Sequence, residues 1–88
     1  LQMNGDDIDM LYARSIVAEQ LNDLKRTESD LKRILELSPN HIDALNALGF
    51  VLASKTNRYD EAQQYLTRAL KLSPNNAQVL DSIGWLYY

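Results

Sequence analysis

The segment ELSPN at residues 36–40 returns as KLSPN at residues 71–75, 35 residues further along the chain. The match continues in the same register, because DALNALGF at residues 43–50 aligns with QVLDSIGW at residues 78–85. Similarity at a fixed period in the mid-thirties is typical of helical solenoids, in which each repeat is a pair of helices stacked on the next pair. The repeat therefore predicts an all-α fold.

Within each period the apolar residues recur every three or four positions, which is the spacing of one face of an α-helix. This pattern predicts five helices, over residues 7–21, 24–37, 41–54, 59–72 and 76–88. We expect residues 1–6 to form a flexible lead-in and residues 7–88 to form one domain. Its repeats would cover about residues 8–41 and 42–76, with a partial repeat at 77–88.

The residues between the expected helices agree with these boundaries. Pro39 and Pro74 each follow the end of a helix, where proline cannot continue the hydrogen-bond ladder. Asn40 and Asn75 are the predicted N-caps of the third and fifth helices, each with a polar residue three positions on, as in a capping box.

The small and apolar positions resemble those of the tetratricopeptide repeat. The second repeat carries the pattern at Leu45, Leu48, Gly49, Leu52, Ala62, Leu66, Ala69 and Pro74. The first repeat departs from it at Arg14 and Thr27. The third begins with Leu80, Ile83, Gly84 and Tyr87 and ends before its second helix. The resemblance implies a right-handed superhelical stack of antiparallel helix pairs, in which the first helix of each pair is the A helix and the second is the B helix.

Gly49 and Gly84 lie on the apolar stripes of two expected A helices. Glycine inside a helix costs about 1 kcal/mol relative to alanine, a cost that is tolerated where two helices approach closely. We therefore expect both glycines to mark close contacts between helices.

Composition excludes several classes of function. The 88 residues contain no Cys and one His, His41, which excludes disulfides, thiolate chemistry and a metal site with several histidines. A net charge of −3 argues against binding to nucleic acid through its phosphates. No apolar run is long enough for a membrane helix, and no signal peptide is visible. The start at Leu1 and the end at Tyr88 suggest an excised piece of a longer protein.

Catalytic chemistry has little support in the sequence. His41 is the only candidate base and is expected at an exposed helix start. Asp6, Asp7 and Asp9 are interpreted as favourable charges at a helix N-terminus rather than as a cation site, because the ligand series of a calcium loop is missing. We predict that the chain is not an enzyme and binds no cofactor or metal.

The A helices of this family line a concave groove, so the resemblance implies a partner-binding surface there. The positions that would face it are Asp9, Tyr12, Ile16, Glu19, Asp43, Asn46, Phe50, Asp81, Trp85 and Tyr88. Several are large aromatic or apolar residues that lie off the core stripe, which favours a contact surface, although packing against neighbouring repeats is the alternative.

Charge separates the A helices from the rest of the chain. The expected A segments carry six acidic residues and one basic residue, Arg14, whereas the remaining segments carry a small excess of bases. The groove is therefore predicted to be acidic and aromatic and to hold a neutral or basic, apolar segment of a partner protein. The alternative is a structural or self-associating segment of a longer array, with weak homodimerisation through Leu80, Ile83 and Tyr87 of the uncovered last helix.

A narrower resemblance concerns the particular residues of the second and third repeats. The stretch ALNALG at 44–49, RYDEA at 58–62 and LDSIGW at 80–85 resembles repeat arrays of Gram-negative bacterial lipoproteins. Some members of that group act as adaptors at the outer membrane. The resemblance implies an adaptor whose parent protein is periplasmic or attached to the outer membrane, with a cytoplasmic parent as the alternative.

Overall fold

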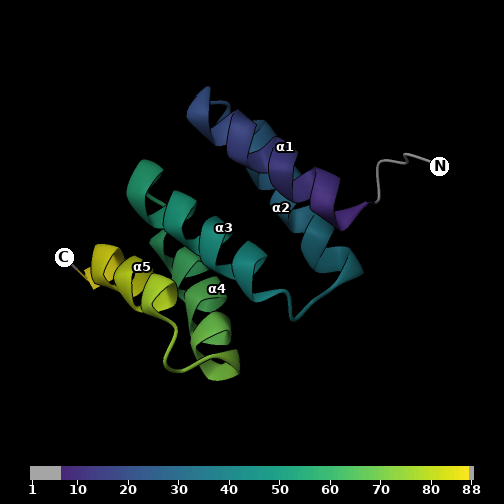
Figure 1. Ribbon diagram of the computed structural model, residues 1–88. Coiled ribbons are helices and arrows are strands. Elements are labelled where there is room, and N and C mark those ends of the chain that lie inside the picture. Colours follow the sequence, from purple (N-terminus) through teal and green to yellow (C-terminus); the bar gives the residue numbers. More distant parts are fainter. Residues whose placement is uncertain (1–6, 88) are drawn as a thin grey trace.

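A computed structural model describes residues 7–87, with side chains described up to residue 84 (Figure 1). It contains the helices α1 (Ile8–Gln20), α2 (Leu24–Leu37), α3 (Ile42–Lys55), α4 (Tyr59–Leu72) and α5 (Ala77–Tyr87). No strand occurs within this range. The predicted all-α class and the five helices are confirmed, and the predicted boundaries within residues 7–87 lie within one residue of the observed ones. The predicted end of the fifth helix, residue 88, lies outside the described residues.

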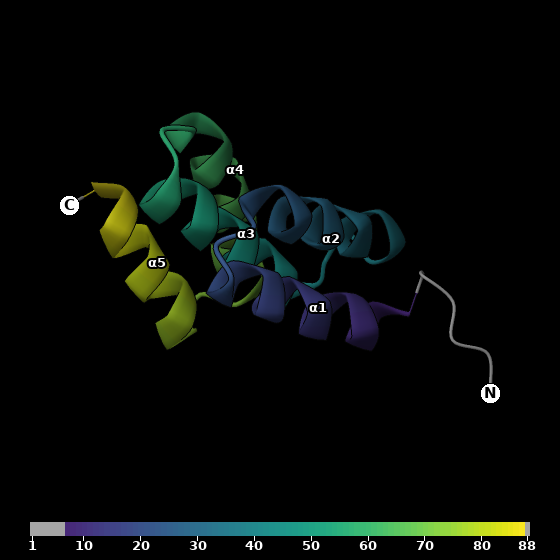
Figure 2. The same ribbon diagram turned by 90° about the horizontal axis from the view of Figure 1, so that it is seen from above.

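The helices form two hairpins and a fifth helix. α1 packs on α2, α3 packs on α4, and α5 packs against both helices of the second hairpin. α2 also contacts α3, which joins the two hairpins. Seen from above, α1, α3 and α5 follow one side of the molecule and α2 and α4 the other (Figure 2). We call the first three the A helices and the other two the B helices.

The link between α1 and α2 is short because α1 ends in a left-handed residue. Asn22 has φ 62°, and asparagine adopts this conformation more readily than most residues. The amide of Asp23 donates to the carbonyl of Ala18 at 2.8 Å, and that of Asn22 donates to Glu19 at 2.9 Å. These two bonds form a Schellman motif, and Asp23 then caps α2 by accepting from Arg26 N.

The predicted N-caps of α3 and α5 are wrong by one residue. His41 caps α3, since its Nδ1 accepts from the amide of Ala44 at 3.1 Å. Asn76 caps α5, accepting from Gln78 and Val79. The cause is a turn after each B helix, closed by the bond from His41 N to Ser38 O and by its counterpart from Asn76 N to Ser73 O. Pro39 and Asn40 are the central residues of the first turn, so the cap falls on the residue that follows.

The centre of the core lies between α3 and the two B helices. Leu45, Leu48 and Leu52 of α3 are at most 1% exposed, as are Leu31 of α2 and Leu66 of α4. Gly49 lies at the closest approach. A Cβ built on it would lie 2.5 Å from Cγ of Leu66 and 3.3 Å from the carbonyl oxygen of Ala62. The predicted close contact at Gly49 is therefore confirmed.

The same prediction is wrong for Gly84. A Cβ built there has no described atom within 4 Å, and Gly84 is exposed. Leu80 is 49% exposed, which agrees with the expectation that the last helix is partly uncovered. The residue of α5 that enters the core is Val79, which is fully buried beside Leu45 and Ala69. α5 thus uses one apolar face against α3 and α4 and leaves a second face open.

The first repeat departs from the family pattern through an ion pair. Arg14 of α1 holds Asp30 of α2 with two hydrogen bonds of 2.9 and 2.8 Å. The Asp30 side chain is 5% exposed and that of Arg14 is 52% exposed. Hydrogen bonding to Asp30 raises the pKa of Arg14 further. The position that holds the buried Leu48 in the second repeat is therefore a half-solvated cation in the first.

Candidate protein-binding face

The predicted contact residues come from three different A helices. We call their described members the A-helix face, and they are Asp9, Tyr12, Ile16, Glu19, Asp43, Asn46, Phe50 and Asp81. Asp9, Asp43 and Asp81 are exposed, one on each A helix. Tyr12, Glu19, Asn46 and Phe50 are partly buried, and Ile16 is 43% exposed. Within the described residues, this face therefore carries solvent-accessible acidic and apolar groups.

Tyr12 marks the point where α1 and α3 come together. Its ring lies 6.1 Å from the His41 ring, centroid to centroid, at the start of α3. Burial raises the pKa of Tyr12, and the negative charges of Asp43 and Glu19 raise it further. The carboxylates that act on Tyr12 thus come from two helices, α1 and α3.

Tyr12 also contributes to packing. It lies against the core cluster that includes Leu11, Leu31 and Leu48. The packing interpretation therefore applies to part of Tyr12, and the rest of the side chain is open to solvent. A role in partner contact stays a prediction. Ile16, one turn further along α1, is more open.

Asn46, in the middle of α3, has a polar atom without a described partner. Its Oδ1 is buried and accepts no hydrogen bond from the described residues. A buried carbonyl oxygen without a donor is costly, so such groups warrant a specific explanation. Because protein atoms cover this oxygen, a molecule on the surface has no direct access to it.

Some predicted positions do not belong to the described face. The side chains of Trp85 and Tyr88 lie outside the described residues, as do residues 1–6 of the expected lead-in. Ser82 also aligns with the groove, yet it is 3% exposed and its hydroxyl donates to the carbonyl of Gln78 at 3.0 Å. It serves the contact between α5 and the second hairpin rather than a partner.

The opposite side of the molecule carries an ion-pair network that the sequence did not reveal. Arg58, at the start of α4, makes a bidentate contact with Glu28 of α2 at 2.6 and 2.7 Å. It also binds Glu61, and Lys32 binds Glu28 at 2.7 Å. Hydrogen bonding from Arg58, followed by Lys32, lowers the pKa of Glu28 to about 2. The network links the B helices of successive repeats across 30 residues of sequence.

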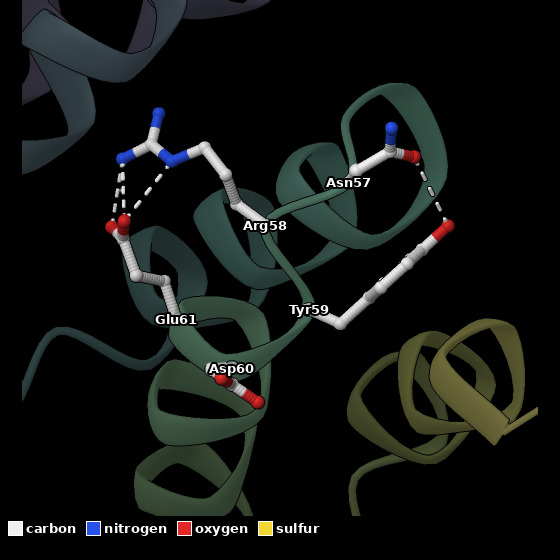
Figure 3. A pocket seen from close by; sticks show the side chains of 5 residues that line it. All are labelled: Asn57, Arg58, Tyr59, Asp60 and Glu61. Atoms are coloured by element: carbon white, nitrogen blue, oxygen red, sulfur yellow. Dashed lines mark hydrogen bonds and ion pairs between the residues drawn. The ribbon is translucent and has the colours of Figure 1, made fainter.

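One cavity lies beside this network and not on the A-helix face. It has a volume of about 320 Å³ and is lined by Asn57, Arg58, Tyr59, Asp60 and Glu61 (Figure 3). Arg58 points to Glu61, and the Tyr59 hydroxyl turns back to Asn57 on the other side. The polar groups of Arg58 and Glu61 satisfy each other, so the cavity offers no nucleophile paired with a base.

The described part of the chain, residues 7–87, shows no feature of a metal site or of a membrane span. Among the described side chains, no group of three or more His, Cys, Asp or Glu residues is placed to hold a metal ion. None of the described helices combines the length and the apolar character needed to cross a bilayer.

Comparison with known proteins adds two findings. Residues 18–86 match the family model described as "Tetratricopeptide repeat". A stretch of 62 residues, 70% of this chain, is 45% identical to the TPR repeat-containing protein PA4667 of Pseudomonas aeruginosa. The aligned part covers 10% of that relative, so the chain spans about a tenth of its length.

Proposed function

The chain belongs to the tetratricopeptide repeat family, whose members generally act as protein–protein interaction scaffolds, and from this premise we propose that its A-helix face binds a segment of a partner protein. The proposed segment is apolar and neutral or basic. The protein would act as a non-catalytic adaptor, as repeats of this family typically do. Attachment of the parent protein to the outer membrane stays a prediction from resemblance.

The observation that carries this proposal is the joint position of Tyr12, Asp43 and Glu19. The Tyr12 ring lies 6.1 Å from the ring of His41, two residues before Asp43, and the exposed Ile16 lies one turn away on α1. Burial and then the negative charges of Asp43 and Glu19 raise the pKa of Tyr12. An aromatic and aliphatic surface rimmed by acids favours a lysine or arginine next to an apolar side chain.

Selection from a random decapeptide display library tests the proposal directly. We expect the selected peptides to be enriched in lysine or arginine beside leucine, isoleucine or phenylalanine. Asp43→Lys should then weaken binding of the selected peptides roughly tenfold, because an attractive charge becomes repulsive. Ile16→Ala should weaken binding of the same peptides without changing how the affinity depends on salt concentration.

Asp60→Lys is the matched control. Asp60 is also an exposed aspartate in the first turn of a helix, but it lies on α4, beside the cavity described above. The same charge reversal there should leave peptide affinity within about twofold, because exposed charges separated by more than the ~8 Å screening length interact weakly. Equal losses for Asp43→Lys and Asp60→Lys would contradict the assignment of the face.

A second candidate function is that of a structural segment of a longer array. Two observations favour this function. The chain spans only about a tenth of its relative, and one face of α5 is open. In that case the library should yield no enriched class of peptide. Phe50→Ala, a change on the A-helix face, should then alter stability alone.

A further inference from the structure

The cap of α3 differs chemically from the cap at the same register position of the next repeat. With the 35-residue offset, His41 corresponds to Asn76. Nδ1 of His41 accepts from the amide of Ala44 at 3.1 Å, whereas Oδ1 of Asn76 accepts from Gln78 at 2.9 Å and from Val79 at 3.3 Å. Both side chains satisfy amides at the start of an A helix, but only the imidazole can take up a proton.

Protonation is incompatible with the observed role of His41. An imidazole nitrogen accepts a hydrogen bond only when it carries no proton, and both nitrogens of an imidazolium are donors. The added positive charge also lies at a helix N-terminus, where the helix dipole disfavours cations. Imidazole is the side chain that ordinarily changes charge between about pH 5 and pH 8. The capping bond is therefore expected at the upper end of this range and should be lost toward its lower end.

The other caps of the described helices have a different chemistry. α1 and α2 are capped by the carboxylates of Asp7 and Asp23, and α5 is capped by the amide of Asn76. Arg58 precedes α4 and makes no capping bond through its side chain. Carboxylates ordinarily keep their charge above about pH 5, and an amide does not titrate. Among these helix starts, a response to pH near neutrality is therefore expected at α3 alone.

The start of α3 also belongs to the A-helix face. The His41 ring lies 6.1 Å from the Tyr12 ring, and Asp43 lies in the first turn of α3. Four helices bring charged or titratable side chains to the segment 36–43, and these are Tyr12 and Glu19 of α1, Glu36 of α2, Asp43 of α3 and Arg68 of α4, which donates to the carbonyl of Pro39 at 2.7 Å. Carboxylates, phenols and guanidinium groups ordinarily keep their charge between about pH 5 and pH 8. A proton taken up here by His41 therefore adds a positive charge to an acidic surface.

We infer that His41 is a pH-sensitive cap: its protonation removes the hydrogen bond at the start of α3 and places a positive charge on the A-helix face, so that acidification weakens binding of a basic partner segment. The part that concerns the partner rests on the function proposed above. The part that concerns the cap applies to the chain alone, so the two parts can be tested separately.

His41→Asn is the variant that keeps a cap and removes the titration, because the chain itself uses asparagine at the equivalent position. Circular dichroism gives the melting temperatures of the parent chain and the variant at about pH 7.5 and about pH 5.5, the range in which imidazole titrates. Acidification should lower the melting temperature of the parent by roughly 4 °C more than that of the variant, the size expected for one N-cap. The amino terminus and the carboxylates titrate in both proteins, so the difference reports His41.

Heteronuclear NMR follows the cap itself over the same pH range. The amide resonance of Ala44 should shift with the titration of the His41 ring in the parent and stay nearly constant in His41→Asn. The amide of Val79, which Asn76 caps, is the internal control and should stay nearly constant in both proteins. Ala44 and Val79 are both fully buried, so a difference between them does not come from exposure to solvent.

A peptide from the display library that contains no histidine tests the effect on the A-helix face. Its affinity for the parent should fall roughly fivefold on acidification, because a new cation repels a basic peptide, and its affinity for His41→Asn should change less than about twofold. His41 is the only histidine of the chain, so the difference between the two proteins has one source.

Each measurement has an outcome that contradicts its part of the inference. Equal pH dependence of the two melting temperatures overturns the pH-sensitive cap, and so does an Ala44 resonance that stays constant while the His41 ring titrates. If the cap responds and the peptide affinities of parent and variant fall equally, the effect on the A-helix face is refuted. A library that yields no peptide contradicts the proposed function instead, and the melting and NMR measurements then decide the inference about His41.

Discussion

Gly49 and Gly84 occupy the same place in two successive repeats and have opposite surroundings. A Cβ at Gly49 would collide with Leu66, while one at Gly84 would meet none of the described atoms. The difference arises from the presence of α4 against α3 and the lack of an equivalent helix against α5 within residues 7–87. A repeat pattern therefore specifies which residues can be buried, and the neighbouring helix decides which of them are buried.

α1 presents the complementary case at the other end of the stack. Met10 and Val17 correspond to Ala44 and Val51 of α3, which are at most 2% exposed. In α1 they are 43% and 53% exposed. Arg14 stands between them and is tied to Asp30, so this open face carries a charge.

The largest effect is expected where the covering helix meets Gly49. Leu66→Ala should lower the free energy of unfolding by about 3 kcal/mol, because it removes a fully buried side chain and leaves a cavity. Leu80→Ala on the open face should cost less than about 1 kcal/mol, since Leu80 is already half exposed. Urea denaturation of both variants measures the difference, and similar losses would show that α5 is covered in solution.

A second prediction concerns the charged position of α1. Arg14→Leu makes the first repeat resemble the second, yet it leaves the buried Asp30 carboxylate without its cation. We expect the melting temperature to fall by roughly 5 °C, because an unpaired buried charge is destabilising. Adding Asp30→Leu should restore most of the loss. A rise in melting temperature with Arg14→Leu alone would show that the ion pair has no structural role.

The third prediction concerns the ion pairs that join the B helices α2 and α4. The pKa of Glu28 is about 2 in the folded protein and lies below its ordinary value of 4.5. The stability it contributes is therefore complete above about pH 4.5 and is lost as the pH falls through about 2. Because Arg58 and Glu61 are about two-fifths exposed, we expect the loss to be only about 1 kcal/mol.

Comparison with Glu28→Gln measures this contribution. The variant should be less stable than the parent at pH 7 and should lose less stability on acidification to pH 2. If the parent and the variant lose equal stability between pH 4.5 and pH 2, the network does not join α2 to α4 in solution.

The sequence predicted the helices well because their signals are local. Apolar spacing and the two prolines placed every boundary within residues 7–87 to within one residue. The N-caps shifted from Asn40 and Asn75 to His41 and Asn76, since a turn closed by Ser38 and Ser73 adds one residue that propensity alone does not reveal. Local sequence signals thus predict which segments are helical, but they locate the N-caps only to within one residue.

The parts that could not be predicted depend on distant contacts. Glu28 and Arg58 are separated by 30 residues, and the sequence marks them only as charges on a solvated surface. Arg14 likewise stands in the sequence only as a departure from the repeat, because its ion pair with the buried Asp30 of α2 depends on how α1 and α2 pack. On the A-helix face, spacing predicted Tyr12 only as a contact residue, whereas its half-packed state depends on the core beneath it.

The most direct test of the account compares one substitution at the two equivalent glycines. Gly49→Ala should lower the unfolding free energy by about 1 kcal/mol, because overpacking against Leu66 outweighs the gain in helix propensity. Gly84→Ala should raise it by about 0.5 kcal/mol, because the added methyl group meets no described atom and alanine favours the helix. Urea denaturation of the two variants beside the parent chain measures both values. Opposite signs are predicted, and a loss of stability of similar size at both glycines would contradict the account.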